Sequence, residues 1–167
     1  MVMTLAVHMV GRQTWEIKLK IKGRVMIDAA IIGIGRWGQY LVKSVQGKSQ
    51  FIKFTAGVTR TKSKAKNFCG ETGIDLRDDY SEILADPNIT AVVLATPHTQ
   101  HEEQIVAAAE AGKHIFTEKP FTLDKSSAER AVEACKKAGV ILALGHNRRF
   151  MDNTVALKAM IEAEELG

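Results

Sequence analysis

The feature that most constrains this chain is a glycine-rich turn between two apolar segments, Gly33-Ile34-Gly35-Arg36-Trp37-Gly38. The apolar run 27–32 is typical of a buried parallel strand, and apolar residues at helical spacing follow in 37–45. The first glycine permits a tight turn, the second lets a pyrophosphate approach the backbone, and the third lets the helix pack closely on the strand. Because the helix N-terminus also offers free N–H groups, the motif predicts a dinucleotide site. A strand–turn–helix corner without a ligand is the alternative.

Composition excludes several classes of protein. The 167 residues, 46% of them hydrophobic and 25% charged, are typical of one soluble globular domain. No apolar run approaches the ~20 residues that span a bilayer. The net charge of +4 comes from residues 1–25, and the remainder is neutral, so a nucleic-acid partner is not expected. Two distant cysteines, Cys69 and Cys135, argue against a disulfide framework and favour a reducing cytoplasm.

Residues 1–25 form a basic extension whose role is open. The apolar start lacks the basic region of a signal peptide. Apolar and charged residues alternate over 15–22, which is typical of a strand that could extend a sheet edge. The favoured interpretation is an upstream extension, strand-like or disordered, because Met26 stands where the first strand of the expected fold begins.

From Met26 onward the pattern alternates strand and helix, which predicts an α/β fold with helices on both faces of a doubly wound, mostly parallel sheet. The expected order is that of a Rossmann fold, 3-2-1-4-5-6, which brings the loops after the strands to one edge. The expected strands are 27–32, 51–59, 74–76, 91–95, 114–117 and 140–144, and the later helices are 62–71, 80–85, 99–111, 124–138 and 150–166. The loops expected to converge hold Gly33–Gly38, Arg60–Thr61, Thr96–His101, Glu118–Pro120 and His146–Phe150.

Four further motifs occur in order after the glycine turn: Ala95–His101, Ala111–His114, Glu118-Lys119-Pro120 and Gly145–Phe150. Together they resemble the glucose–fructose oxidoreductase, inositol dehydrogenase and rhizopine catabolism family of NAD(P)-dependent oxidoreductases, over residues 26–167. The resemblance implies a cofactor-binding Rossmann domain at 26–149 and, at 150–167, the helical start of a linker. It also implies a second α/β domain, absent from this sequence, that supplies substrate contacts, an Asp and a His for proton transfer, and the oligomer interface.

Lys119 is the expected catalytic residue. An ammonium beside a stiff turn can polarise a substrate hydroxyl oxygen and favour loss of its proton. A solvated surface lysine is the alternative on the residues alone, and the resemblance implies the substrate and cofactor role. Pro120 is expected to be cis or a restricted turn former. Glu118 is expected to hydrogen-bond the cofactor or to cap the strand end.

Arg60 lies about twenty residues beyond the third glycine, where an NAD-selective fold places an acid on the ribose 2′-hydroxyl. An arginine there can pair bidentately with a 2′-phosphate, and Thr61 adds a donor. The sequence therefore predicts NADP in preference to NAD. A solvated basic helix N-terminus is the alternative.

The remaining candidates follow the later strands. Thr96 and Pro97 are expected to line the nicotinamide side, and Asn147 to order the nicotinamide loop or bind an anionic group. The resemblance places His101 near the cofactor ribose, and a solvent-facing histidine is the alternative. No metal is expected, because His98 and His101 lack a third ligand. The cofactor-binding set is Gly33, Ile34, Gly35, Arg36, Trp37, Gly38, Arg60, Thr61, Thr96, Pro97, His101, Glu118, Lys119 and Asn147.

These expectations converge on the cofactor-binding half of an oxidoreductase that passes hydride between nicotinamide and a sugar, cyclitol or similar hydroxyl compound. The half alone is expected to be incomplete for catalysis, because the nicotinamide stays wet without a second domain. A companion C-terminal domain or a homo-oligomer is the expected partner besides the small polyol or sugar. The alternative is a non-catalytic dinucleotide-binding or regulatory module.

Overall fold

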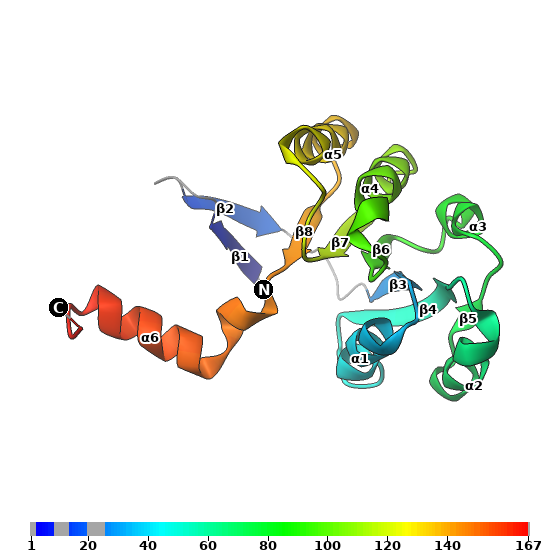
Figure 1. The fold of residues 1–167 in the computed structure, drawn as a ribbon, viewed down its shortest axis with the longest axis horizontal. Coiled ribbons are helices and arrows are strands. Elements are labelled where there is room, and N and C mark those ends of the chain that lie inside the picture. Colours follow the sequence, from blue (N-terminus) through cyan, green and yellow to red (C-terminus); the bar gives the residue numbers. More distant parts are fainter. Residues whose placement is uncertain (1–2, 9–13, 20–25, 167) are drawn as a thin grey trace.

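The computed structural model describes residues 3–8, 14–19 and 26–166, and its centre is a six-stranded parallel sheet (Figure 1). The strand order is β5-β4-β3-β6-β7-β8, with every neighbouring pair parallel. When the six strands are numbered in chain order, with β3 as strand 1, this is the predicted order 3-2-1-4-5-6. The Rossmann prediction is therefore confirmed. The strands are β3 (Ile27–Ile32), β4 (Ile52–Val58), β5 (Asp75–Leu76), β6 (Ala91–Leu94), β7 (His114–Glu118) and β8 (Leu142–Gly145).

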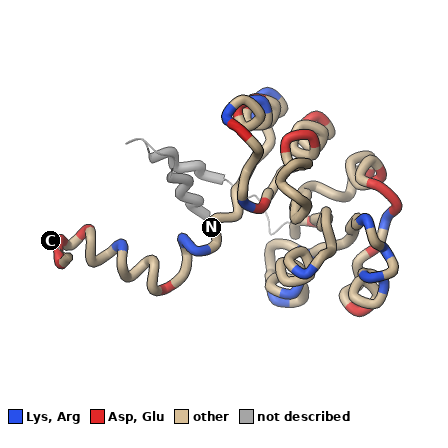
Figure 2. Tube along the Cα trace, in the orientation of Figure 1, with Lys and Arg blue, Asp and Glu red and all other residues tan. Residues whose placement is uncertain are grey.

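Helices cover both faces of the sheet, with α1 and α2 on one side and α3, α4 and α5 on the other (Figure 1). Basic and acidic residues occur on the helices of each side (Figure 2). The bounds are α1 (Arg36–Val45), α2 (Lys62–Thr72), α3 (Tyr80–Ala85), α4 (His101–Glu110), α5 (Lys125–Ala138) and α6 (Asp152–Glu162), with short 3-10 turns η1 (His98–Gln100) and η2 (Asn147–Phe150).

The core consists of two apolar clusters, one on each face of the sheet. Alternate residues of β3 serve the two faces, since Ala30 and Ile32 belong to one cluster and Ala29 and Ile31 to the other. Each cluster holds one buried free thiol: Cys135 belongs to α5, and Cys69 belongs to α2. Because all four of these β3 side chains are at most 2% exposed, the strand is buried on both faces, as its apolar run predicts.

Aspartate caps fix where two of the helices begin. Asp79 accepts hydrogen bonds from the backbone N–H groups of Ser81 and Glu82 at the start of α3. Asp124 accepts from the Ser127 N–H at 2.8 Å, and the Ser127 hydroxyl accepts from the Asp124 N–H at 3.1 Å, which is a reciprocal capping box at the start of α5.

The N-terminal extension contributes two strands, β1 (Met3–His8) and β2 (Thr14–Leu19), which pair antiparallel in a sheet of their own. The strand predicted over 15–22 therefore does not extend the edge of the six-stranded sheet. The parts of the extension at 1–2, 9–13 and 20–25 lie outside the described residues.

At the other end, α6 has no buried residue and carries exposed apolar side chains, among them Val155, Leu157 and Ile161. Within the described part of the chain, no helix combines the length and the apolar character needed to cross a membrane.

Candidate functional site

The glycine turn joins β3 to α1 at the centre of the sheet edge. Gly33 has φ 95°, and a Cβ there would lie 2.7 Å from the carbonyl oxygen of Ala95, so both its conformation and its space require glycine. A Cβ on Gly38 would overlap the Gly33 carbonyl, which is the close helix–strand approach that the motif predicts. The first glycine and the third therefore shape the turn itself.

Gly35 differs from the other two glycines because no atom lies within 4 Å of the position of its Cβ. Gly35 is the N-cap residue of α1, and no side chain caps the helix there. The first backbone hydrogen bond of the helix runs from the Gln39 N–H to the Gly35 carbonyl at 2.9 Å. The N–H groups of the first turn therefore have no partner within the helix, and the position of a Cβ on Gly35, at the start of this turn, is open. A diphosphate fits such an opening, and no acidic residue of the first turn would repel it.

The other residues of the turn divide between core and surface. Ile34 is 3% exposed and belongs to the cluster under α1 and α2, so only its backbone is available to a ligand. Arg36 is exposed. Trp37 stacks on Tyr40 with ring centroids 5.0 Å apart, so the indole packs on its own helix.

The loop after β4 places Arg60 and Thr61 immediately before α2. Arg60 is exposed, and Thr61 is the residue before the first turn of the helix, with no side-chain cap hydrogen bond. The neighbouring Lys62 is paired with Asp78. Among the described residues no carboxylate forms an ion pair with Arg60. An anion could therefore bind its guanidinium without displacing a partner.

The loop after β6 is held by its own helix. The Thr96 hydroxyl lies 2.6 Å from the side-chain oxygen of Gln104, one turn into α4, and Pro97 leads into η1. Sequence reasoning missed Gln104. It follows three other polar residues, His101, Glu102 and Glu103, so the sequence alone did not distinguish it.

The loop after β7 holds the Glu-Lys-Pro motif. The Lys119–Pro120 peptide is cis, which confirms the expectation for Pro120. Glu118 is 7% exposed and its carboxylate accepts the Lys119 backbone N–H at 3.3 Å. The Lys119 side chain is exposed, so its ammonium is free to meet a ligand at the carboxyl edge of the sheet.

Gly145, at the end of β8, is the register partner of Glu118 and makes room for its carboxylate. A Cβ on Gly145 would lie 3.0 Å from Oε1 of Glu118 and 2.9 Å from the ring of Phe116. Sequence reasoning did not assign this glycine a role. Asn147, two residues further on, lies exposed in η2.

His101 is a buried residue at the start of α4. The ring is 1% exposed, so the solvent-facing alternative is wrong. Its nitrogens face three backbone carbonyls, those of Thr96, Pro120 and Phe121, at 3.0 to 3.1 Å. A direct contact with the cofactor ribose stays a prediction that this burial does not favour.

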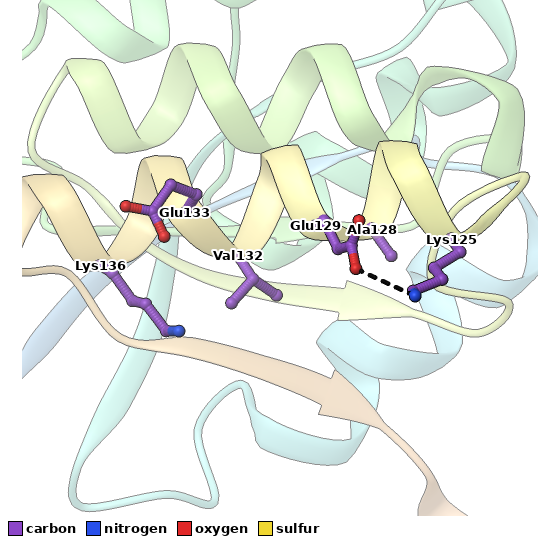
Figure 3. Close-up of a pocket in the computed structure, with 6 residues that line it drawn as sticks. All are labelled: Lys125, Ala128, Glu129, Val132, Glu133 and Lys136. Carbon is purple, nitrogen blue, oxygen red and sulfur yellow. Dashed lines mark ion pairs between the residues drawn. The ribbon is translucent and has the colours of Figure 1, made fainter.

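Two surface hollows lie over α4 and α5, and the second reaches Thr99 of η1. One runs along α5 and is lined by Lys125, Ala128, Glu129, Val132, Glu133 and Lys136, with an ion pair between Lys125 and Glu129 at 3.5 Å (Figure 3). The other lies between α4 and α5. Neither contains a candidate residue, so the converging loops remain the candidate site. In the described part of the chain, no group of three or more His, Cys, Asp or Glu side chains is arranged to hold a metal ion.

A model of the oxidoreductase family with an NAD-binding Rossmann fold matches residues 27–146. The chain belongs to this family. Members of this oxidoreductase family include the dehydrogenases that resemble the chain in sequence and structure. Scyllo-inositol 2-dehydrogenase (NAD(+)) of Bacillus subtilis is 37% identical over 142 residues, which cover 84% of this chain and 42% of that protein. D-xylose 1-dehydrogenase (NADP(+)) of Hypocrea jecorina is 35% identical over 88 residues, 53% of this chain and 22% of that protein.

Among solved structures, scyllo-inositol dehydrogenase from Lactobacillus casei with bound NAD(H) and scyllo-inositol matches with a TM-score of 0.79 and 28% identity. The match covers 86% of this chain and 43% of that one. The chain thus spans about two fifths of the length of the inositol dehydrogenases it matches. The family's coenzymes, NAD(H) and NADP, are the ones that the named relatives use.

Proposed function

We propose that this chain is the cofactor-binding part of an NAD(P)-dependent dehydrogenase acting on the CH–OH group of a sugar, a cyclitol or a similar compound. The observation that carries the proposal is the open space at Gly35, beside the free N–H groups of α1 and on the same sheet edge as the exposed Lys119. Family membership and the inositol and xylose dehydrogenases among the relatives support the substrate class.

The residues present fit a dinucleotide. The N–H groups that open α1 at Arg36, Trp37 and Gly38 would hold the diphosphate, because they are unpaired within the helix and lie at its positive end. Thr96 and Pro97 would line the nicotinamide side at the end of β6, which lies next to β3 in the sheet. The bound nicotinamide supplies the hydride acceptor or donor at its C4 atom.

Lys119 would act on the substrate oxygen. When a secondary alcohol is oxidised, its carbon loses a hydride and its hydroxyl loses a proton. An ammonium hydrogen-bonded to that oxygen stabilises the negative charge that develops on it. The exposed side chain would do this at the edge where the strands end, and the Lys119 backbone N–H donates to the carboxylate of buried Glu118. Glu118 and Asn147 would complete the wall of the site.

The coenzyme preference rests on Arg60. The names of the relatives include both NAD(+) and NADP(+), so they do not choose between the two. Arg60 stands at the loop where an NAD-selective site places an acid, and it has no carboxylate partner among the described residues. A guanidinium there favours a 2′-phosphate, which gives NADP the advantage.

The test is calorimetric titration of the chain with NADPH and with NADH. We expect NADPH to bind at least about tenfold more tightly, a difference of about 1.4 kcal/mol. Arg60→Ala should remove this difference and leave NADH affinity unchanged. Lys136→Ala, which removes an equal charge from α5, should change neither. Equal affinities in the wild-type chain would refute the NADP preference, and binding of neither coenzyme would refute the dinucleotide site.

The alternative, a non-catalytic binding or regulatory module, makes a different prediction. It requires saturable binding of NADPH and no turnover of polyols or sugars, with or without a companion polypeptide. The exposed apolar side chains of α6, including Val155 and Leu157, support a companion domain or a second copy as partner. Sedimentation of the purified chain tests self-association. A cytoplasmic location belongs to the proposal and is supported by the two free, buried thiols.

A further inference from the structure

The side chain of Gln104 connects α4 to the loop after β6. Its amide oxygen, Oε1, accepts a hydrogen bond from the Thr96 hydroxyl at 2.6 Å. Its amide nitrogen, Nε2, donates to Oε1 of Gln100 at 3.4 Å. Both ends of the amide therefore have a partner. All three side chains are uncharged, so the contact between Thr96 and Gln104 does not depend on an ionised group.

The length of the contact between Thr96 and Gln104 identifies its donor. A distance of 2.6 Å lies within the usual range of O–H···O hydrogen bonds and below that of N–H···O hydrogen bonds. The Thr96 hydroxyl is therefore the donor, and the amide oxygen of Gln104 is the acceptor. A hydroxyl has one proton and two lone pairs. Because Gln104 holds the proton, Oγ1 of Thr96 can only accept a further hydrogen bond.

Other contacts fix both partners of this hydrogen bond. The backbone N of Thr96 lies 3.1 Å from the position of a Cβ on Gly33, so the residue stands against the glycine turn. Its carbonyl oxygen lies 3.0 Å from Nε2 of His101. The Tyr80 hydroxyl donates to the backbone carbonyl of Gln104 at 3.0 Å, and the Tyr80 ring packs against the core. Neither partner can therefore turn away without breaking a further contact.

We propose that Gln104 is a positioning residue that fixes the Thr96 hydroxyl as an acceptor, so that this loop selects a coenzyme that presents an N–H donor. The carboxamide of nicotinamide has such a donor. A methyl ketone in its place would set one acceptor against another, and a polar group left unpaired in this way discriminates strongly between ligands. This inference rests on the proposed function, which puts Thr96 on the nicotinamide side.

Coenzyme analogues test the proposal without any turnover. In the acetylpyridine analogue of oxidised NADP a methyl ketone replaces the carboxamide, whereas the thionicotinamide analogue keeps the N–H donors. Calorimetric titration of the chain should show the acetylpyridine analogue bound about tenfold more weakly than NADP, and the thionicotinamide analogue within about twofold of it. Equal binding of NADP and the acetylpyridine analogue would overturn the proposal and leave the dinucleotide site intact. Binding of none of the three would refute the proposed function, and this inference with it.

Substitutions show whether the preference for the carboxamide depends on Gln104. In Gln104→Met the Thr96 hydroxyl loses its acceptor and can turn to donate to the ketone, so the preference should fall below about twofold. Gln104→Glu keeps an oxygen acceptor and should retain the preference, because any effect of its charge on both coenzymes cancels in the ratio. Gln100→Met, the matched control, leaves the contact with Thr96 in place and should also retain it. A full preference in Gln104→Met would overturn the role of Gln104.

A double-mutant cycle measures the contact itself in the absence of nucleotide. Thr96→Val and Gln104→Met each remove one partner with little change in volume, and urea unfolding compares both single variants with the double variant. We expect a coupling of about fivefold in the unfolding equilibrium constant, the scale of one hydrogen bond. Coupling below about twofold would overturn the proposal. If Gln104→Met does not fold, Thr96→Val takes its place in the titrations, and a preference that survives the loss of the hydroxyl overturns the proposal.

Discussion

A methyl group on Gly38 would overlap the carbonyl oxygen of Gly33, so the third glycine of the turn is in contact with the backbone of the first. This contact brings the start of α1 against the end of β3. The third position of the motif is therefore a packing position, whereas Gly35, with open space before it, is the position that faces a ligand. The two roles can be separated by substitution.

Gly38→Ala is expected to destabilise the fold. The added methyl meets backbone that cannot rotate away, so we expect the free energy of unfolding to fall by about 1–3 kcal/mol, the usual cost of overpacking. Urea unfolding followed by circular dichroism measures it. Gly70→Ala is the matched control: it lies exposed within α2 with nothing within 4 Å of its Cβ, so it should stabilise by about 0.5–1 kcal/mol. Equal stability of the two variants would contradict the packing role.

Gly35→Ala is expected to spare the fold and weaken nucleotide binding. A methyl here meets no protein atom, but it would occupy open space at the start of α1, where the proposal places the diphosphate. The unfolding midpoint should stay within about 0.5 kcal/mol of wild type, and calorimetry should show at least about a tenfold loss of NADPH affinity. Unaltered affinity in a folded Gly35→Ala chain would place the diphosphate elsewhere.

Lys119→Met should affect chemistry far more than binding. The side chain is exposed, so stability should change by less than about 0.5 kcal/mol. In an assay with the companion domain that the proposal includes, kcat for a polyol should fall by about a hundredfold or more, the scale of a lost proton-transfer group. NADPH affinity should stay nearly constant. A variant with near wild-type kcat would remove Lys119 from the mechanism. Lys136→Met, an exposed change near the C-terminal end of α5, is the control.

Lys113→Met is expected to be strongly destabilising for a lysine substitution. The Lys113 side chain is only 6% exposed, and its ammonium donates to the carbonyl oxygens of Asp86 and Ile89 at 2.6 and 2.8 Å. Methionine fills the space but donates to neither carbonyl. The Asp86 oxygen keeps the Ile89 N–H at 3.3 Å, whereas the Ile89 oxygen loses its lysine partner, which costs about 1–3 kcal/mol. Lys66→Met, exposed on α2, should cost almost nothing. Denaturant unfolding compares the two, and similar midpoints would show that the buried ammonium contributes little.

The free energy of unfolding depends in part on the ionisation of Asp124, and so on pH. Hydrogen bonds from the Ser127 backbone N–H and from the Ser126 and Ser127 hydroxyls lower the pKa of Asp124 from 3.8 to about 2. Because the folded value lies below the unfolded one, the cap's contribution is complete above the unfolded value and is lost as the pH falls toward about 2. Asp124→Asn retains an acceptor that does not titrate. Its stability relative to wild type should therefore rise as the pH falls from about 4 to about 2, measured by urea unfolding at each pH. A constant difference would contradict the capping contact.

Local patterns predicted most of the fold, since strand and helix positions depend on apolar spacing, glycine breaks and caps that stand beside each other in the chain. The order of the sheet was expected from the alternation together with the glycine turn, which is typical of a Rossmann fold. The contacts of His101 could not be predicted in this way, because two of its three acceptors lie 19 and 20 residues away, in a loop that only the packed sheet brings near. Lys113 is similar, with partners 24 and 27 residues distant. A helix-start histidine and a turn lysine resemble surface residues until the tertiary contacts are known.

The residues of the candidate site also fall into two groups: those that local sequence patterns predicted and those that only tertiary contacts revealed. The glycine turn and the Glu-Lys-Pro motif are local signals, and both occur at the predicted edge of the sheet. Gly145 and Gln104 became visible only through their partners, Glu118 and Thr96, since neither pair is adjacent in the sequence. The β1–β2 hairpin also escaped prediction, because an alternating pattern indicates a strand without naming the strand it pairs with.

The two buried thiols can report on how the chain unfolds. Cys69 and Cys135 lie on opposite faces of the sheet, and burial raises the pKa of each, which slows alkylation of the native chain. A thiol reagent can therefore modify each cysteine only after the helices on its face of the sheet have separated from the strands. The labelling rates of the two residues would time the opening of the layers separately and show whether the chain comes apart in one step or two.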